Sequence, residues 1–368
     1  MQMVGRLLLM TVLLVALPAR GAEADWPCFR GSATMRGSAR SALPAKPERL
    51  WRHEAGAGVT STAAIVGERV FVGTDGGKVL CLELKTGKQV WAFRATDPVS
   101  AAPCVAGGMV YVGDEGGTFY ALKSATGEKV WDFKTKVKII SSGTYAAGAI
   151  LFGSYDNHLY CLEAKTGRKK WAFKADNYVH CSPCVAGDRV VIAGCDGDVR
   201  MIRLETGEQA AAAETNGNFA ACAAYDAGHV FVGDMAGKCY AVRCKDAKIV
   251  WTREPEDAGG FFAGAAVSGD AVVFASQGGK VLAAKRGTGA VLWSVDLESA
   301  VDSSPVIAGK TAYVGTGGGD VLGLRLADGK QVWKFAAGSE IVASPAVSRG
   351  RLVIGAQDGA IYCFGKNP

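Results

Sequence analysis

The sequence predicts an all-β protein, an eight-bladed β-propeller built from four-stranded antiparallel blades. Two columns of recurring residues lead to this prediction. Tryptophan recurs about every 40 residues, with one place taken by Ala211, at Trp51, Trp91, Trp131, Trp171, Trp251, Trp293 and Trp333. A glycine after a β-rich run recurs at the same interval, at Gly73, Gly113, Gly153, Gly194, Gly233, Gly315 and Gly355, with Ser276 in the sixth place. Both columns have eight places, and such a period is typical of radial repeats.

One unit shows how each blade is built. Residues 59–94 contain the runs TSTAAIV, RVFVGT, KVLCLEL and KQVWAF, which are separated by glycine-containing turns suited to hairpins. The last unit ends at IYCFGKNP after three strands, whereas the chain begins with an unmatched fourth strand, ERLWRHEA, at 48–55. We therefore expect the N-terminal strand to pair with the last blade and close the ring, which removes an open sheet edge.

The first residues have the features of a secretory signal peptide. Arg6 precedes the apolar run at 7–17, and the small residues that follow end in Ala22-Glu23-Ala24. We expect cleavage before Asp25, because the apolar run is short for a membrane anchor. The expected organisation is a signal peptide (1–24), an N-terminal leader (25–47) and one propeller (48–368). The mature protein is expected to be exported, either periplasmic or extracellular, and soluble.

Charge and composition argue against nucleic-acid binding. The formal charge is +6 for 368 residues, and it falls to +5 when residues 1–24 are removed. Basic residues do not cluster with stacking aromatic residues in the way that nucleic-acid-binding surfaces require. We expect no nucleic-acid partner, no transmembrane segment in the mature chain, and a monomer.

The segments AKTGRKKW and SATGEKVW resemble the tryptophan-docking motif of the pyrroloquinoline-quinone (PQQ) type repeat. The resemblance covers about residues 48–364. It implies a quinoprotein-like propeller in which each of the seven recurring tryptophans docks on a Thr-Gly turn of a neighbouring blade. Proteins with these repeats include quinoprotein alcohol dehydrogenases and the non-enzymatic BamB subunit of the outer-membrane barrel-assembly machinery. The start of the leader, DWPCFRG, is also similar to the DWPxFRG opening of many exported proteins with these repeats.

The chain departs from the enzymes of this resemblance. Such a dehydrogenase needs an aromatic floor for the quinone, ligands for calcium and an aspartate base, and often has a disulfide between adjacent cysteines. Here seven of the eight tryptophans are in the docking column, the eighth is Trp26 in the leader, and adjacent cysteines are absent. We therefore expect no cofactor, neither PQQ nor calcium, no metal, and no catalytic residues.

The eleven cysteines are an odd number, so at least one has no partner within the chain. Cys81, Cys161 and Cys363 share a third-strand place that is Ala121, Ala241 and Gly323 in other units, which favours packed free thiols. Cys181 and Cys184 form a CSPC motif, but residues three apart on a strand point to opposite faces. A bond from either of them to Cys222 in the next unit stays possible.

Candidate binding residues lie at the mouth of the central funnel, where the innermost strands begin. The residues there vary from unit to unit, whereas the positions beside them are uniformly apolar. A solvated rim and a binding surface are both compatible with this variation, and loops on rigid scaffolds often bind ligands. The candidates are Asp97, Lys138, Tyr178, His180, Asn218, Asp302 and Glu340, with Phe262 at the equivalent place of one further unit.

The sequence thus favours a non-catalytic protein-binding or assembly scaffold in the cell envelope, with protein partners. An alternative stays open. The protein could be a quinoprotein-type enzyme, or it could bind a small ligand, such as a cofactor or a sugar, in the central funnel. No His-Asp-Ser or two-His-carboxylate spacing supports the alternative, since the only histidines are His53, His158, His180 and His229.

Overall fold

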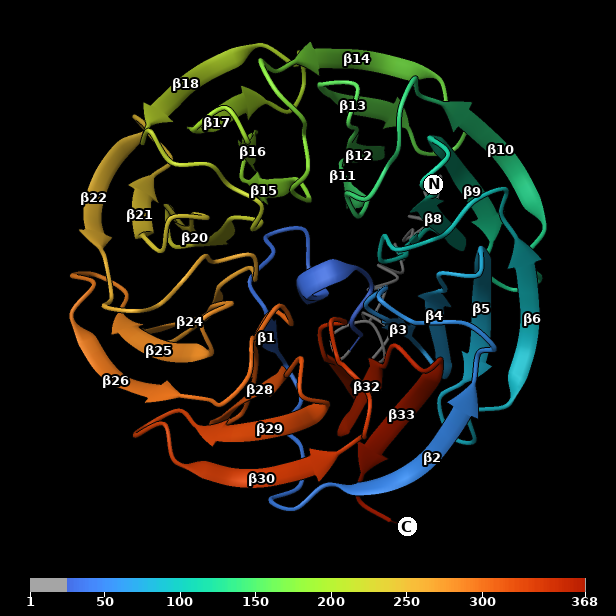
Figure 1. Cartoon of the computed structure of the whole chain (residues 1–368). Coiled ribbons are helices and arrows are strands. Elements are labelled where there is room, and N and C mark those ends of the chain that lie inside the picture. The colour runs from blue at the N-terminus through green and yellow to red at the C-terminus, as the bar shows by residue number, and fades with distance from the viewer. Residues whose placement is uncertain (1–24, 368) are drawn as a thin grey trace, which may run out of the picture.

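A computed structural model describes residues 25–367. The predicted signal peptide lies outside the described residues. Eight antiparallel sheets form a closed ring, and the chain runs around it from blade to blade (Figure 1). Among the described residues, no helix has the length and hydropathy needed to cross a bilayer.

The first four blades follow one another along the chain. Blade 1 contains β3 (Ala64–Val66), β4 (Arg69–Gly73), β5 (Lys78–Glu83) and β6 (Gln89–Arg94). Blade 2 contains β7 (Cys104–Ala106), β8 (Met109–Gly113), β9 (Thr118–Lys123) and β10 (Lys129–Lys134). Blade 3 contains β11 (Thr144–Ala146), β12 (Ala149–Gly153), β13 (His158–Glu163) and β14 (Lys169–Lys174). Blade 4 contains β15 (Cys184–Ala186), β16 (Arg189–Ala193), β17 (Asp198–Arg203) and β18 (Gln209–Glu214).

The second half repeats this arrangement. Blade 5 contains β19 (Ala224–Asp226), β20 (His229–Gly233), β21 (Cys239–Arg243) and β22 (Lys248–Arg253). Blade 6 contains β23 (Ala266–Ser268), β24 (Ala271–Ala275), β25 (Lys280–Lys285) and β26 (Val291–Asp296). Blade 7 contains β27 (Val306–Ala308), β28 (Thr311–Gly315), β29 (Asp320–Arg325) and β30 (Gln331–Ala336). Blade 8 contains β31 (Ala346–Ser348), β32 (Arg351–Gly355) and β33 (Ala360–Gly365), and its outer strand is β2 (Glu48–Glu54).

The pairing of β2 with β33 confirms the predicted ring closure. The two strands are antiparallel, with Trp51 opposite Cys363 and Glu54 opposite Ala360. The first strand of the propeller and the last therefore belong to one sheet, although about 300 residues separate them in the sequence. This pairing shields the edge of β33, which would be exposed without β2.

Each outer strand has a β-bulge just before the tryptophan place. In blade 1 the pairing passes from Cys81–Trp91 to Leu82–Gln89, so Val90 has no partner and is 39% exposed. The same shift occurs in blade 4 between Met201 and Ile202, although Ala211 replaces the tryptophan there. The bulge is thus part of the repeat's backbone rather than a consequence of the indole.

The predicted glycine column needs two corrections. The residues that end the second strand in register with Gly73 are Ala193 in blade 4 and Ala275 in blade 6, not Gly194 and Ser276. Gly73 lies against the first strand region of the next blade, where an added Cβ would come within 2.4 Å of the Val99 carbonyl oxygen. The place therefore demands a small side chain, and the sequence period alone could not separate alanine from an adjacent glycine.

The indoles lie between blades. Trp91, from blade 1, donates its Nε1–H to the Ser124 carbonyl of blade 2 at 3.0 Å, and a Cβ on Gly127 would come within 2.6 Å of the ring. The equivalent donor of Trp333 reaches Pro47 O, 2.9 Å away, across the ring closure. At Gly127 the positive φ (75°) and the close approach of the ring both favour glycine.

The joint between blades 4 and 5 is built differently. Ala211 stands opposite Met201, whereas Trp91 stands opposite the smaller Cys81. The turn glycine is replaced by Ala247. The carbonyl of Cys244 accepts from Arg189 Nη1 at 3.1 Å, in the place of an indole N–H. Met201 and Ala247 therefore differ from their counterparts at the other joints in ways that suit a joint without an indole ring, and Arg189 supplies a donor in its place.

The leader crosses one mouth of the ring and contains one turn of 3₁₀ helix, η2 (Phe29–Gly31), which Figure 1 shows inside the circle of blades. Its carbonyl groups accept hydrogen bonds from the innermost strands of six blades, and β1 (Ser38–Ala39) pairs with β27 in parallel. These donors are Ile65, Val105, Val185, Tyr225, Val267 and Ile307. We call this side of the disc, which carries the β3–β4 hairpin and its equivalents, the leader face.

Candidate functional site

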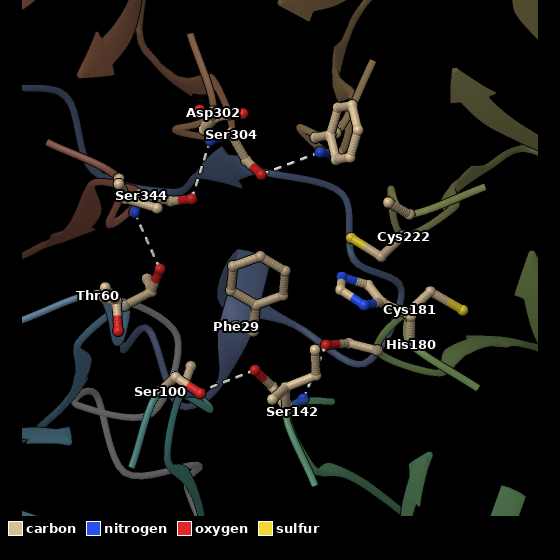
Figure 2. A pocket seen from close by; sticks show the side chains of 18 residues that line it. Phe29, Thr60, Ser100, Ser142, His180, Cys181, Cys222, Asp302, Ser304 and Ser344 are labelled. Atoms are coloured by element: carbon tan, nitrogen blue, oxygen red, sulfur yellow. Dashed lines mark hydrogen bonds between the residues drawn. The ribbon is translucent and has the colours of Figure 1, made fainter. Parts of the chain in front are cut away.

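The central channel opens on the side opposite the leader. We call this side the open face, and it carries the loops that join the second and third strands, such as 74–77 and 114–117. The channel holds a cavity of about 160 Å³. Two rings of side chains surround it, and Phe29 from the leader stands at the centre of the view in Figure 2. The channel is therefore a pocket with one open end.

Hydroxyl groups connect the inner ring from blade to blade. The backbone N–H of Ala102 donates to Ser142 Oγ at 2.9 Å, and the N–H of Ser142 donates to Ser182 Oγ at 3.0 Å. Equivalent bonds join Gly264 to Ser304, Ser304 to Ser344 and Ser344 to Thr62. The convergence of eight strands leaves room only for small residues, and their hydroxyls satisfy backbone donors that would otherwise be unpaired.

The floor of the pocket comes from the leader. Phe29 enters the cavity, while Arg30 is only 1% exposed and donates to the carbonyls of Pro305 (2.7 Å) and Ala265 (2.5 Å) in blades 7 and 6. Desolvation by burial lowers the pKa of Arg30 to about 10. The guanidinium therefore stays charged near neutral pH and bridges two blades beneath the pocket.

An aromatic cluster, Lys138, Tyr155, Tyr178 and His180, lies on the open face at blades 3 and 4. The rings of Tyr155 and Tyr178 stack at 4.7 Å with an angle of 8° between their planes. The Nζ of Lys138 lies 4.6 Å from the Tyr155 ring centre, a cation–π contact. The Tyr155 hydroxyl is 2.6 Å from His180 Nδ1, and the His180 ring reaches the cavity.

Burial controls the protonation of this cluster. Desolvation lowers the pKa of His180, and the charge of Lys138 lowers it further. Desolvation also raises the pKa of Tyr155 to about 12. At neutral pH the imidazole is therefore neutral, and the phenol keeps its proton and can donate it to Nδ1.

Carboxylates lie beside the cluster on the open face. Thr60 donates to Asp75 Oδ1 at 2.6 Å, and Ser100 donates to Glu115 Oε1 at 2.8 Å. These four residues and Lys138 line a groove of about 540 Å³ that shares Thr60 and Ser100 with the channel. On the far side of the mouth, Gln277 Nε2 donates to Asp302 Oδ1 at 2.9 Å.

The predicted rim residues occupy different places. His180 and Asp302 line the cavity, and Lys138 lines the groove. Tyr178 is 47% exposed and stacks on Tyr155. The carboxylate of Asp97 lies over Gly116 in the next blade. Asn218 and Glu340 are exposed, and their carbonyl groups accept hydrogen bonds from the N–H groups of Met235 and Gln357 in the next loop.

Four residues that sequence reasoning did not select belong to the site. Tyr155 is the centre of the aromatic cluster, and Thr60 and Ser100 bond the carboxylates. An aromatic residue in SYDN, where neighbouring loops read TDGG and DEGG, was a signal for Tyr155. The fourth residue, Phe29, lies in a segment without a repeat pattern, so its place in the channel had no signal.

The cysteines form no metal site in the part of the chain that the structure describes, because no group of three candidate ligands comes together there. In this structure all eleven have free thiols, and only Cys195 is more than slightly exposed. The CSPC pair points to different surroundings. Cys181 Sγ accepts from the Ala193 N–H at 3.3 Å, and Cys184 Sγ donates to Thr34 O in the leader at 3.3 Å.

The fold and pocket define a class: an eight-bladed propeller of repeated Trp-Gly joints with one end of its channel closed. The family model described as "Outer membrane protein assembly factor BamB" matches residues 36–148, 134–210 and 195–366, so the chain belongs to this family. A search of curated proteins found no match.

Solved structures of the same fold include proteins with different names. BamB from Moraxella catarrhalis has a TM-score of 0.77 and 16% identity, covering 87% of this chain and 98% of that one. The quinohemoprotein alcohol dehydrogenase from Comamonas testosteroni has a TM-score of 0.80 and 15% identity, covering 95% and 82%. The computationally designed Ika8 protein has a TM-score of 0.77 and 17% identity, covering 86% and 98%. At these identities the likeness concerns the fold alone.

Proposed function

We propose that this protein is an exported, non-catalytic scaffold that binds a protein partner in the cell envelope through its open face. Membership of the BamB family supports an assembly role. In this proposal residues 1–24 are removed before Asp25 and the mature chain is a monomer. N-terminal sequencing of the secreted protein and its elution volume in gel filtration test these two points.

The observation that carries the proposal is the aromatic cluster. Tyr178 is exposed, yet it is held in one orientation by stacking on Tyr155, which Lys138 and His180 hold in turn. A pre-oriented aromatic side chain loses little conformational entropy on binding, and tyrosine is enriched among the residues that dominate protein interfaces. The carboxylates of Asp75 and Glu115 in the neighbouring groove add negative charge, which would favour a partner with a complementary charge.

The dimensions of the channel argue against a quinone cofactor. Its cavity of about 160 Å³ is smaller than the roughly 300–1,000 Å³ of sites that enclose drug-sized ligands. Phe29 fills the floor, and the seven recurring tryptophans each donate to a carbonyl of a neighbouring blade. The residues present therefore do not fit a tricyclic quinone with a calcium ion.

A small polar ligand is the second candidate. The cavity presents His180, Thr60, Ser100 and Asp302 above an aromatic floor, and this set of donors and acceptors suits a ligand with several hydroxyl groups. Calorimetric titration with monosaccharides, and absorbance after incubation with PQQ and calcium, test this candidate. Heat that saturates at one site and disappears in His180→Gln would favour it over the protein partner.

The main experiment is affinity capture from envelope extract with the mature chain as bait. The Tyr178→Ala bait removes the exposed ring of the cluster. Tyr145→Ala is the matched control, because Tyr145 is also an exposed tyrosine (37%) of blade 3 but lies on an inner strand at the leader face. We expect one protein to be captured by the wild-type and Tyr145→Ala baits and lost with Tyr178→Ala. Capture that is equal for all three baits would contradict the assignment of the open face.

A further inference from the structure

The leader and blade 2 bring two cysteines together. The Val105 N–H donates to the Pro27 carbonyl at 2.7 Å, so the residues next to this pair, Cys28 and Cys104, are neighbours across the contact. Both side chains are buried, with exposed fractions of 3% and 2%. They belong to one apolar core between blades 2 and 3, together with Tyr111 and Phe119.

The two thiols are close enough for Cys104 to affect the protonation of Cys28. The pKa of Cys28 is raised well above its ordinary value, first by the side-chain hydrogen bond with Cys104 and then by burial. The contact of Cys184 with the leader differs in kind, because Cys184 Sγ donates to the backbone carbonyl of Thr34. Cys28 is the only cysteine of the leader, and Cys104 is the cysteine that shares its apolar core.

We propose that Cys28 and Cys104 form a disulfide that fastens the leader to blade 2 when the chain folds in oxidising surroundings. The thiolate of one cysteine attacks a disulfide oxidant, such as oxidised glutathione, and forms a mixed disulfide. The second thiolate then displaces the glutathione thiolate and forms the Sγ–Sγ bond. The protein loses two protons and two electrons, and the oxidant is reduced to two thiols. The reaction occurs during folding, before burial suppresses the thiolates.

The position of the bond gives it a function. Cys28 directly precedes Phe29, the floor of the channel, and the leader then passes from blade 2 to blade 4, where Val185 donates to Ala33 O at 2.7 Å. The disulfide therefore holds the N-terminal side of the loop that carries Phe29. It also closes a chain loop through the whole of blade 1, which restricts the unfolded chain.

The direct test is disulfide mapping of the mature chain. The protein is refolded with a mixture of reduced and oxidised glutathione, then denatured, alkylated and digested for mass spectrometry. We expect two of the eleven cysteines to escape alkylation and one linked peptide pair containing Cys28 and Cys104. Alkylation of all eleven, or a bond from Cys28 to another cysteine, would overturn the proposal.

Variants provide a second readout. Cys104→Ala is a mild change, because alanine occupies the equivalent place in blades 1, 5, 6 and 8, as at Ala64 and Ala224. The control is Cys81→Ala, a buried cysteine of β5 in blade 1. We expect the wild type and Cys81→Ala to melt at a higher temperature after oxidative than after reductive refolding, and Cys104→Ala to show no difference. A difference that persists in Cys104→Ala would contradict the assignment even if the variant is less stable overall.

Discussion

Removing one indole tests how the blades are held together. Trp91 is 8% exposed, lies 5.9 Å from Phe71 between ring centres, and bonds to Ser124 of the next blade. A tryptophan side chain buries about 150–250 Å² of surface, and the hydrogen bond that Trp91 makes contributes about 1 kcal/mol. When the side chain is removed, the surrounding residues fill the cavity only in part. We therefore expect Trp91→Ala to lower the free energy of unfolding by about 3–5 kcal/mol.

The same joint can be disturbed from its other side. In Gly127→Ala, the new Cβ would come within 2.6 Å of the Trp91 ring, at a φ of 75° that disfavours a side chain. We expect a cost of about 2 kcal/mol or more, from strain and from displacement of the indole. Because both changes damage one contact, the double variant should cost less than the sum of the single variants.

Urea unfolding followed by tryptophan fluorescence and by circular dichroism measures these costs. The control is Val130→Ala, at an outer-strand position that is 46% exposed, where a change within about 0.5 kcal/mol is expected. The slope of the transition must stay constant for the midpoints to be compared. If Trp91→Ala cost less than about 1 kcal/mol, or no more than Val130→Ala, the joints would not be the main fastening between blades.

Three further predictions concern single contacts. Arg189→Ala should lower the free energy of unfolding in urea by about 1–3 kcal/mol, and by more than Arg351→Ala does. Without Arg189 the Cys244 carbonyl loses its side-chain donor, whereas without Arg351 the Leu84 carbonyl still accepts from Trp51. Equal costs for the two variants would contradict this. Hydrogen exchange should be faster in β18 than in β6, since Ala211 provides no indole to pack against blade 5, and equal protection of the two strands would refute this. The lowered pKa of His180 means that the folded state favours the neutral ring, so its contribution to stability is complete above the ordinary pKa and is lost as the pH falls below about 6.5. Melting temperatures at pH 7.5 and 5 should therefore differ more in the wild type than in His180→Gln, and an identical difference would show that another group is responsible.

The propeller could be predicted because the same residue types recur at the same place in each repeat, where the same packing is needed. The tryptophan interval sets the number of blades, and the unmatched strand at 48–55 predicts the closure seen between β2 and β33. Alternation within a single unit would only have indicated hairpins. The glycine column was wrong by one residue in blades 4 and 6, because alanine is also small enough for this place, and Ala193 and Ala275 occupy it.

The candidate site was less predictable, since it depends on contacts between loops of different blades. His180 and Lys138 were selected from the variation at the mouth, but their common partner Tyr155 lies on another loop. The compensation of Ala211 by Met201 and Arg189 also joins residues from different strands. The leader had no periodicity at all, so neither its course nor the position of Phe29 followed from the pattern.

The course of the leader has a consequence for the order of folding. The leader residues come before blade 1 in the sequence, yet their hydrogen-bond partners include Val267 and Ile307 in blades 6 and 7. Likewise, β2 can pair only after β33 has been synthesised. Contacts that join such distant parts of a chain form slowly, because a long loop must close first. During synthesis the segment that closes the channel must therefore stay unattached to its later partners until blades 6 and 7 exist. A chain truncated before Val306 would lack both β33 and the partner strand of β1, leaving the leader and β2 exposed to proteolysis.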